Sequence, residues 1–266
     1  MKIGFIGSGK MAEAIISGVL NSGIIDSENI LCSDINKERI NYINNKYKTS
    51  TFGNNSTIID KCDLIFLCVK PQDINKLKND LYDNLRENQS LLSILAGIRI
   101  STLSNVSNHK SIVRIMPNTP AQIKKGVSVW THTKETSKKH VEYIDMILNS
   151  IGAQYKVENE ETIEMATALS ASGPAYLFYF IESLIESGEN IGLPKDLSEK
   201  LTLGMLKGSL DLFQVSNETA EKLRGNVTSP GGTTEAAINI LQKKNFKNSI
   251  IEAINAAHKR GLDLGE

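Results

Sequence analysis

The sequence has little cysteine, no excess of either charge and no long hydrophobic run, and each shortage excludes a class of protein. The three cysteines, Cys32, Cys62 and Cys68, form no CxxC pair, which argues against a disulfide framework and a zinc site. Thirty basic residues balance thirty acidic ones, so we expect neither a nucleic-acid partner nor a membrane surface. No stretch approaches about 18 consecutive apolar residues, which excludes a transmembrane helix.

Signals for export and for metal binding are missing as well. Residues 1–6 run directly into a strand pattern and contain no apolar signal-peptide segment or cleavage site. The histidines, His109, His132, His140 and His258, stand in no metal-ligand spacing and beside no obvious Ser or Cys nucleophile. We therefore expect a cytoplasmic protein without a metal site.

The first part of the chain alternates short β-branched runs with helical stretches. This pattern is typical of βαβ units and predicts an α/β domain with a mostly parallel sheet over residues 1–158. The predicted strands are 2–6, 29–33, 64–69, 90–95, 111–116, 126–130 and 153–157, with helices at 10–22, 37–46 and 72–84.

The rest of the chain, residues 159–266, contains only helical periods and predicts an all-α domain. Its expected helices are 162–170, 175–191, 197–213, 233–243 and 246–261. The first half of the helix at 175–191 is apolar nearly all round, so it must be buried on most of its circumference. The remaining residues supply little to cover it, and we expect a second subunit to bury it.

A glycine-rich turn follows the first predicted strand and opens the first helix. Residues 7–12 have the spacing G-x-G-x-x-A, in which Gly7 makes the tight turn and Gly9 lets the backbone approach a pyrophosphate. The amides of the helix N-terminus then bind the phosphates. The motif predicts a Rossmann-type dinucleotide-binding domain.

Asp34 stands where the second strand ends and bears on the choice of cofactor. A carboxylate there accepts hydrogen bonds from a ribose diol and favours NAD. Lys37 and Arg39 follow closely and could instead receive the 2′-phosphate of NADP. Asp34 could also simply cap the next helix, and these alternatives stay open.

Residues 228–235, Thr-Ser-Pro-Gly-Gly-Thr-Thr-Glu, precede an apolar helix in the second half. The exposed amides of such a loop, leading into a helix N-terminus, suit a small carboxylate. An ordinary capped loop is the alternative. Three further stretches contain polar residues and prolines that packing of a core does not explain: 68–72, 116–120 and 172–176.

Together these stretches resemble the pyrroline-5-carboxylate reductase family, and the resemblance covers nearly the whole chain. Residues 226–234, Asn-Val-Thr-Ser-Pro-Gly-Gly-Thr-Thr, are its most specific part. Cys68 stands where the family has Ala, and Asp34 stands where many members have Ser or Asn and prefer NADPH. The resemblance implies a Rossmann-type domain followed by an all-α dimerisation domain, assembled as a homodimer or a larger homo-oligomer.

The resemblance also implies a set of site residues. The cofactor would contact Ile6, Gly7, Ser8, Gly9, Lys10, Met11, Asp34, Asn55, Cys68, Val69, Lys70, Pro71, Ala96 and Asn226. The substrate would contact Glu160, Ser229, Gly231, Gly232, Thr233 and Thr234. The cofactor is NADPH or NADH: the family favours the first, and Asp34 favours the second.

The implied reaction is reduction of the cyclic imine 1-pyrroline-5-carboxylate to L-proline. The imine nitrogen gains a proton as hydride reaches the neighbouring carbon, so a hydrogen-bond donor beside nitrogen helps. We assign Thr234 to this role, orienting the ring or relaying a proton through water.

Two other functions are compatible with a nucleotide-binding domain followed by helices. A β-hydroxyacid dehydrogenase would need a lysine on the helical domain, where Lys195, Lys200 and Lys207 lie without a neighbouring Gly-Gly motif. A non-catalytic NAD(P)-sensing dimer would not need the loop at 229–234.

Overall fold

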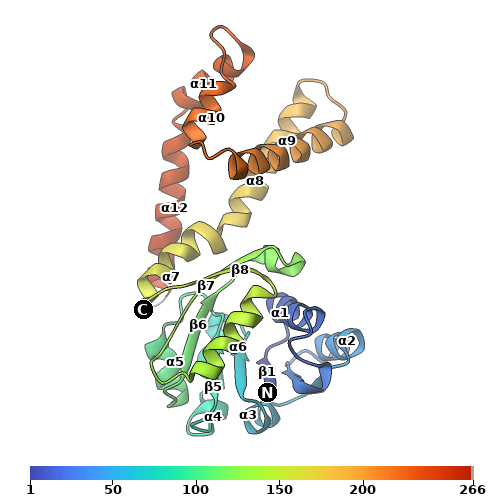
Figure 1. Ribbon diagram of the computed structural model, residues 1–266, viewed down its shortest axis with the longest axis vertical. Coiled ribbons are helices and arrows are strands. Elements are labelled where there is room, and N and C mark those ends of the chain that lie inside the picture. Colours follow the sequence, from blue (N-terminus) through green and yellow to red (C-terminus); the bar gives the residue numbers. More distant parts are fainter. Residues whose placement is uncertain (265–266) are drawn as a thin grey trace. The chain divides into compact units, whose positions relative to one another are not determined.

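The computed structural model describes residues 1–264 (Figure 1). Its contacts divide the chain into two compact units. The first comprises Met1–Ser172 and the chain from Ala257, and the second comprises Gly173–Ala256. These contacts group residues 159–172 with the sheet. The domain division expected between residues 158 and 159 stays a prediction.

The first unit is built on one sheet with the strand order β3-β2-β1-β4-β5-β6-β7-β8 (Figure 1). Neighbouring strands are parallel except β6 and β7, which confirms the mostly parallel sheet. Chain order reverses between β1 and β4, the point where such sheets bind ligands. The strands are β1 (Ile3–Ile6), β2 (Ile30–Ser33), β3 (Ser50–Phe52), β4 (Leu64–Leu67), β5 (Ser90–Ser93), β6 (Ile112–Met116), β7 (Gly126–His132) and β8 (Gly152–Lys156).

Both faces of the central strands are covered, because alternate side chains enter two separate cores. On one face Phe5 and Phe66 stack at 5.0 Å and belong to a cluster that includes residues of the helices α1 (Lys10–Asn21), α2 (Lys37–Tyr47) and α6 (Lys138–Asn149). On the other face Ile65 and Leu67 join a cluster that includes residues of the helices α3 (Ser56–Lys61), α4 (Lys78–Leu81) and α5 (Ile100–Ser107). Side chains buried on both faces explain why these strands read as continuous apolar runs.

The helices of this unit are mostly short. Asn36 caps α2 by accepting hydrogen bonds from the amides of Glu38 and Arg39, so Asn36, not Asp34, is the cap. The helix expected at residues 72–84 is instead a 3₁₀ helix, η2, followed by a single α-turn. The bounds are α1 (Lys10–Asn21), α2 (Lys37–Tyr47), α3 (Ser56–Lys61), η2 (Pro71–Leu77), α4 (Lys78–Leu81), α5 (Ile100–Ser107), η3 (Thr119–Ile123), α6 (Lys138–Asn149), α7 (Glu160–Ala166) and the π-helical turn η4 (Thr167–Ala171).

The second unit is entirely helical in the described residues, as expected. It contains α8 (Gly173–Asn190), α9 (Lys195–Val215), α10 (Ala220–Asn226), α11 (Thr233–Lys243) and most of α12 (Phe246–Asp263). Gly192 has φ +99° and lets the chain turn between α8 and α9. An added Cβ at Gly188 would lie 2.6 Å from Ser198 Oγ, so this glycine permits the close packing of the two helices.

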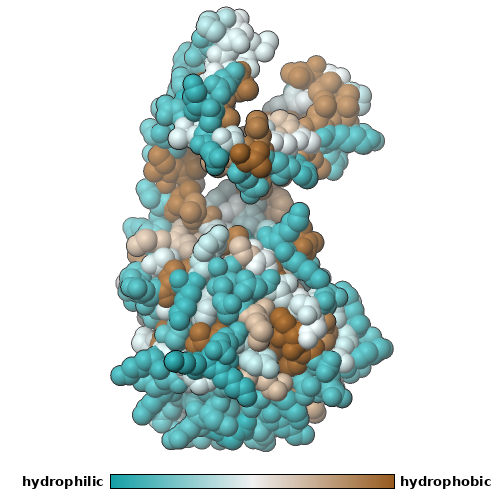
Figure 2. Space-filling model, in the orientation of Figure 1, coloured by the Kyte–Doolittle hydropathy of each residue, from teal (hydrophilic) through white to brown (hydrophobic). Residues whose placement is uncertain are grey.

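Apolar side chains lie at the surface of the second unit (Figure 2). On α8, Leu177 is 50% exposed, Phe178 61% and Tyr179 73%, and within the described chain no residue of this helix is buried. A single chain therefore leaves the apolar helix uncovered. No helix in residues 1–264 combines the length and apolarity needed to cross a membrane.

A buried polar cluster occupies the amino ends of β5 and β6. Ser90 Oγ lies 2.7 Å from His140 Nδ1 and 2.6 Å from Ser111 Oγ. His140 is thus a buried histidine with a hydrogen-bond partner, and its neighbour Ser90 could not be recognised from the sequence because 50 residues separate them. Ser90 is fully buried, and the cluster lies at the opposite end of the sheet from the glycine-rich turn. The Ser–His pair consequently has no access to a substrate and serves the core.

We expect His140 to make the protein less stable in mild acid. Burial lowers the pKa of His140 below 6.5, a shift that Asp63 opposes and Lys139 reinforces. Below pH 6.5 the unfolded chain therefore binds a proton that the folded chain resists, and the free energy of unfolding falls until the folded pKa is reached. One such group contributes a slope of at most about 1.4 kcal/mol per pH unit. Urea unfolding at pH 5.5, 6.0 and 7.0 measures this dependence. The free energy of unfolding should change less with pH in His140→Asn than in the wild type, and an equal change in both would contradict the assignment.

Candidate functional site

The glycine-rich turn joins β1 to α1 and has the geometry of a phosphate site. Gly7 has φ +93°, and an added Cβ would lie 2.7 Å from the Cys68 carbonyl oxygen. An added Cβ at Gly9 would meet no atom within 4 Å, so the backbone there is open to a ligand. Gly9 caps α1 without a side-chain hydrogen bond, which leaves the first amides of the helix for an anion. These residues fit a dinucleotide pyrophosphate.

The end of β4 packs directly against this turn. The Cys68 amide donates to the Ile6 carbonyl at 2.8 Å, and the Gly7 amide donates to the Ser33 carbonyl at 2.9 Å. Burial raises the pKa of the Cys68 thiol, so the sulfur is an uncharged packing group. Lys70 is exposed and precedes η2, which begins at Pro71. The structure thus brings residues 6–11 and 68–71 together at the carboxyl edge of the sheet.

Asp34 follows β2 and lies at the same edge of the sheet, beside the glycine-rich turn. Its Oδ2 accepts the Ser8 amide at 2.7 Å, and its Oδ1 accepts the Asn36 amide at 2.8 Å. Both carboxylate oxygens are thereby held in place by backbone. Asn55 lies nearby: Ser33 Oγ donates to its Oδ1 at 2.7 Å, and its Nδ2 donates to Asp80 at 2.7 Å.

A charged cluster behind the turn was not predicted from the sequence. Arg39 donates through Nε to the Ser8 carbonyl and through Nη2 to the Gly9 carbonyl and to Glu13. Glu13 Oε1 also accepts from Lys46 at 2.9 Å. Burial alone raises the pKa of Glu13, but hydrogen bonds from Lys46, Arg39 and Tyr42 outweigh burial and lower the pKa to about 2. Glu13 is therefore charged throughout the working pH range and fixes Arg39.

Glu160, at the start of α7, is joined to the sheet by a buried arginine. Its Oε1 accepts from Arg114 Nη1 and from the Ile100 amide, both at 2.9 Å. Arg114 Nη2 also donates to Glu164 at 2.7 Å. Arg114 was missed, although an arginine inside the apolar run of β6 was a visible signal. Ala96 packs against a small apolar cluster of Met116, Val129 and Ile163.

The remaining predicted site residues lie in the second unit. The Gly231 amide donates to Glu235 Oε2 at 2.8 Å, and the Gly232 amide donates to the Ser229 carbonyl at 3.0 Å. Gly231 has φ +73°, which the turn requires. Thr233 and Thr234 open α11, where backbone amides have no partner within the helix. Asn226 Nδ2 donates to Glu218 at 3.0 Å.

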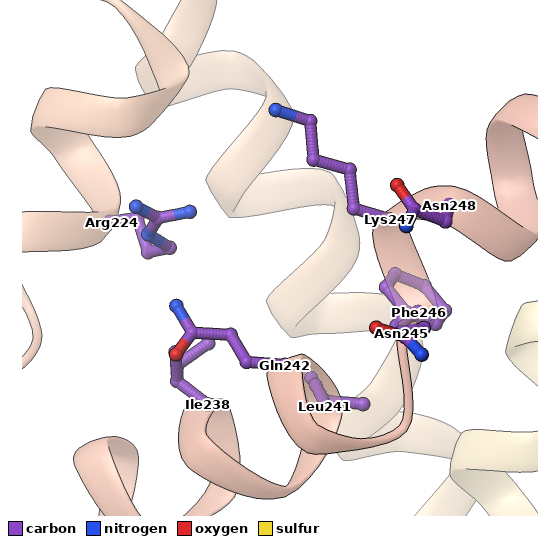
Figure 3. Close-up of a pocket in the computed structure, with 8 residues that line it drawn as sticks. All are labelled: Arg224, Ile238, Leu241, Gln242, Asn245, Phe246, Lys247 and Asn248. Atoms are coloured by element: carbon purple, nitrogen blue, oxygen red, sulfur yellow. The ribbon is translucent and has the colours of Figure 1, made fainter.

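A cavity of about 350 Å³ lies among α10, α11 and α12 (Figure 3). The nitrogen-bearing ends of Arg224, Gln242 and Lys247 point into it, above Ile238 and Leu241 (Figure 3). None of the predicted site residues lines this cavity. It is formed by helices whose apolar side chains a single chain leaves exposed, so it belongs to the uncovered surface of this unit.

The candidate site thus consists of two groups of residues. The cofactor residues and Glu160 lie in the first unit, whereas Asn226, Ser229 and residues 231–234 lie in the second. Among the described residues no cluster of His, Cys, Asp or Glu could hold a metal ion. Of the lysines weighed for hydroxyacid chemistry, Lys207 is paired with Asp211.

Comparison with known families covers both units. Residues 160–264 match the family model described as pyrroline-5-carboxylate reductase dimerisation. Residues 2–97 match the model described as NADP oxidoreductase, coenzyme F420-dependent. The first match places the helices with exposed apolar side chains in a dimerisation domain, which supports a homo-oligomer.

Individual relatives align over almost their full length. Pyrroline-5-carboxylate reductase 2 of Bacillus subtilis is 34% identical, with 100% of this chain and 95% of that protein covered. The enzyme of Arabidopsis thaliana is 32% identical, with 100% and 96% covered. The crystal structure of Plasmodium falciparum pyrroline carboxylate reductase with NADP bound has a TM-score of 0.92 and 31% identity, with 100% and 98% covered. The chain belongs to the pyrroline-5-carboxylate reductase family of oxidoreductases.

Proposed function

We propose that this chain reduces 1-pyrroline-5-carboxylate to L-proline with a reduced nicotinamide dinucleotide. The observation that carries the proposal is the turn at residues 7–12, open at Gly9 and closed against Cys68, in a chain aligned end to end with named reductases. When bound, the reduced nicotinamide supplies the hydride for the C=N bond. A cytoplasmic location and the absence of a nucleic-acid partner stay predictions from the sequence.

The first unit holds and orients the cofactor. The amides at the start of α1 bind the pyrophosphate, and Asp34 with Asn55 lies toward the adenosine side. Residues 68–71 and Ala96 follow β4 and β5 at the carboxyl edge, where the nicotinamide would lie.

The start of α11 binds the carboxylate of the substrate. The Gly231 amide donates to the carboxylate of Glu235, and this contact supports the loop as a site for such a group. The amides of Thr233 and Thr234 open the helix and carry its partial positive charge, so they are the ones left for a ligand. The loop therefore favours a small anionic substrate over a neutral imine.

Thr234 supplies the hydrogen bond beside the imine nitrogen. A hydroxyl can donate to nitrogen or pass on the proton of a water, whereas it is too weak an acid to give up its own proton outright. Glu160 is the other side chain expected to contact the substrate, and its Oε1 is fixed by Arg114 and by the Ile100 amide.

We expect Thr234→Ala to lower kcat/KM for pyrroline-5-carboxylate by about 100-fold. The lost donor acts on charge that changes in the transition state, and such a donor is worth about 3 kcal/mol. Oxidation of reduced cofactor with pyrroline-5-carboxylate, with proline formation as product control, measures the effect. Thr234→Ser keeps the hydroxyl and should recover most of the rate. An unchanged kcat/KM in Thr234→Ala would remove this residue from the mechanism, and a wild type that forms no proline would end the proposal.

A further inference from the structure

The end of β2 presents an acid and an apolar side chain where a dinucleotide's adenosine ribose is recognised. Asp34 is fixed by the amides of Ser8 and Asn36, each to a different oxygen, so its carboxylate is already aimed. Each carboxylate oxygen has a further lone pair and can accept from a ribose hydroxyl. Ile35, the next residue, is fully exposed at 101%, and its side chain offers a phosphate neither charge nor a hydrogen bond.

Two of the three nitrogens of the Arg39 guanidinium are already hydrogen-bonded within the protein. Arg39 donates to the Ser8 and Gly9 carbonyls and pairs with Glu13, whose side chain is only 11% exposed. Glu13 is held in turn by Lys46, Tyr42 and Tyr47 at 2.9–3.1 Å. These contacts use Nε and Nη2, so only Nη1 is left for a 2′-phosphate while the guanidinium stays paired with its mostly buried carboxylate, and breaking that pair is strongly unfavourable. Arg39 therefore mainly stabilises the turn and cannot turn its full guanidinium to the ribose.

The charges left at this edge do not favour a phosphate. Lys37 and Glu38 are both exposed in the first turn of α2 and offset one another, which leaves the carboxylate of Asp34 as the dominant charge. A dianionic 2′-phosphate beside a fixed carboxylate is repelled, whereas a ribose diol gains two acceptors.

We propose that this chain selects NADH over NADPH, with Asp34 and Ile35 as the residues that set the preference. The inference rests on the proposed function and narrows its cofactor. The crystal structure of the Plasmodium falciparum relative has NADP bound, so binding of NADPH is the alternative that the test must compare.

Calorimetric titration of the full-length protein with NADH and with NADPH tests the preference independently of turnover. We expect a Kd for NADH that is lower than that for NADPH by about tenfold or more. Asp34→Ser should raise the Kd for NADH and lower the Kd for NADPH. The double variant Asp34→Ser with Ile35→Arg should reverse the order, because arginine pairs with a phosphate.

Asp26→Ser is the matched control, since it removes the same charge at the opposite end of β2 and should leave both affinities unchanged. A wild type that binds NADPH as tightly as NADH, or more tightly, would overturn the preference. Loss of NADPH affinity alone in Arg39→Met or Lys37→Met would assign the phosphate to that cation and overturn Asp34 and Ile35 as the residues that set the preference. In either case proline formation would leave the proposed function standing, whereas a protein that binds neither cofactor and forms no proline would refute both.

Discussion

Replacing Arg114 by methionine should lower the free energy of unfolding by about 3–5 kcal/mol. The arginine side chain is fully buried on β6 and pairs with Glu160 and Glu164, of which Glu164 is itself 1% exposed. Removing the cation leaves a buried carboxylate without its partner, and this unpaired charge accounts for most of the loss. Guanidinium chloride unfolding, followed by circular dichroism, measures the change in midpoint and slope.

A second substitution separates the unpaired charge from lost packing. Glu164→Gln in the Arg114→Met background removes the uncompensated charge, so we expect the double variant to be more stable than Arg114→Met alone. If the double variant were no more stable, the buried charge would not be the cause. The Arg114→Met variant also tests the role of Glu160, because this carboxylate loses the arginine that fixes it. If Glu160 contacts the substrate, the KM for substrate should rise more than the KM for cofactor changes.

The sheet could be predicted from the sequence because its strands are buried on both faces and separated by helices. β4 and β6 read as apolar runs, and the glycine-rich turn marks the end of β1. The exception is β3, which has only three residues, Ser50–Phe52, all half-buried at the sheet edge. So short a polar segment carries no period, and its pairing with β2 forms only in the folded sheet.

The site residues also divide into those with a local sequence signal and those defined only by contacts in the fold. Glycines and strand ends are local signals, so the cofactor turn and Asp34 could be identified from their spacing. The Arg39–Glu13 pair spans 26 residues and the Arg114–Glu164 pair spans 50, and neither has a local signature. Whether Lys37 or Arg39 is held by other groups of the protein depends on three-dimensional contacts. The cofactor preference was therefore open in the sequence and became arguable only from the structure.

Replacing Phe178 by aspartate should raise the dissociation constant of the homo-oligomer about 100-fold or more. Phe178 is 61% exposed on α8, beside Leu177 and Tyr179, in a helix that has no buried residue in the described chain. Burying a phenylalanine is worth about 1.5–3 kcal/mol, and a two-fold interface loses it twice. The aspartate adds the cost of burying a charge without a partner. Light scattering after size-exclusion chromatography across a dilution series measures the shift.

Tyr82→Asp is the matched control, because it also places a carboxylate at an exposed aromatic position, 44% exposed, but in the first unit. Its oligomeric state should equal that of the wild type. The helical unit cannot cover its own apolar face, so dissociation should also lower its thermal stability and make that stability depend on protein concentration. A wild type that stays folded and monomeric at micromolar concentration would show that α8 needs no second subunit.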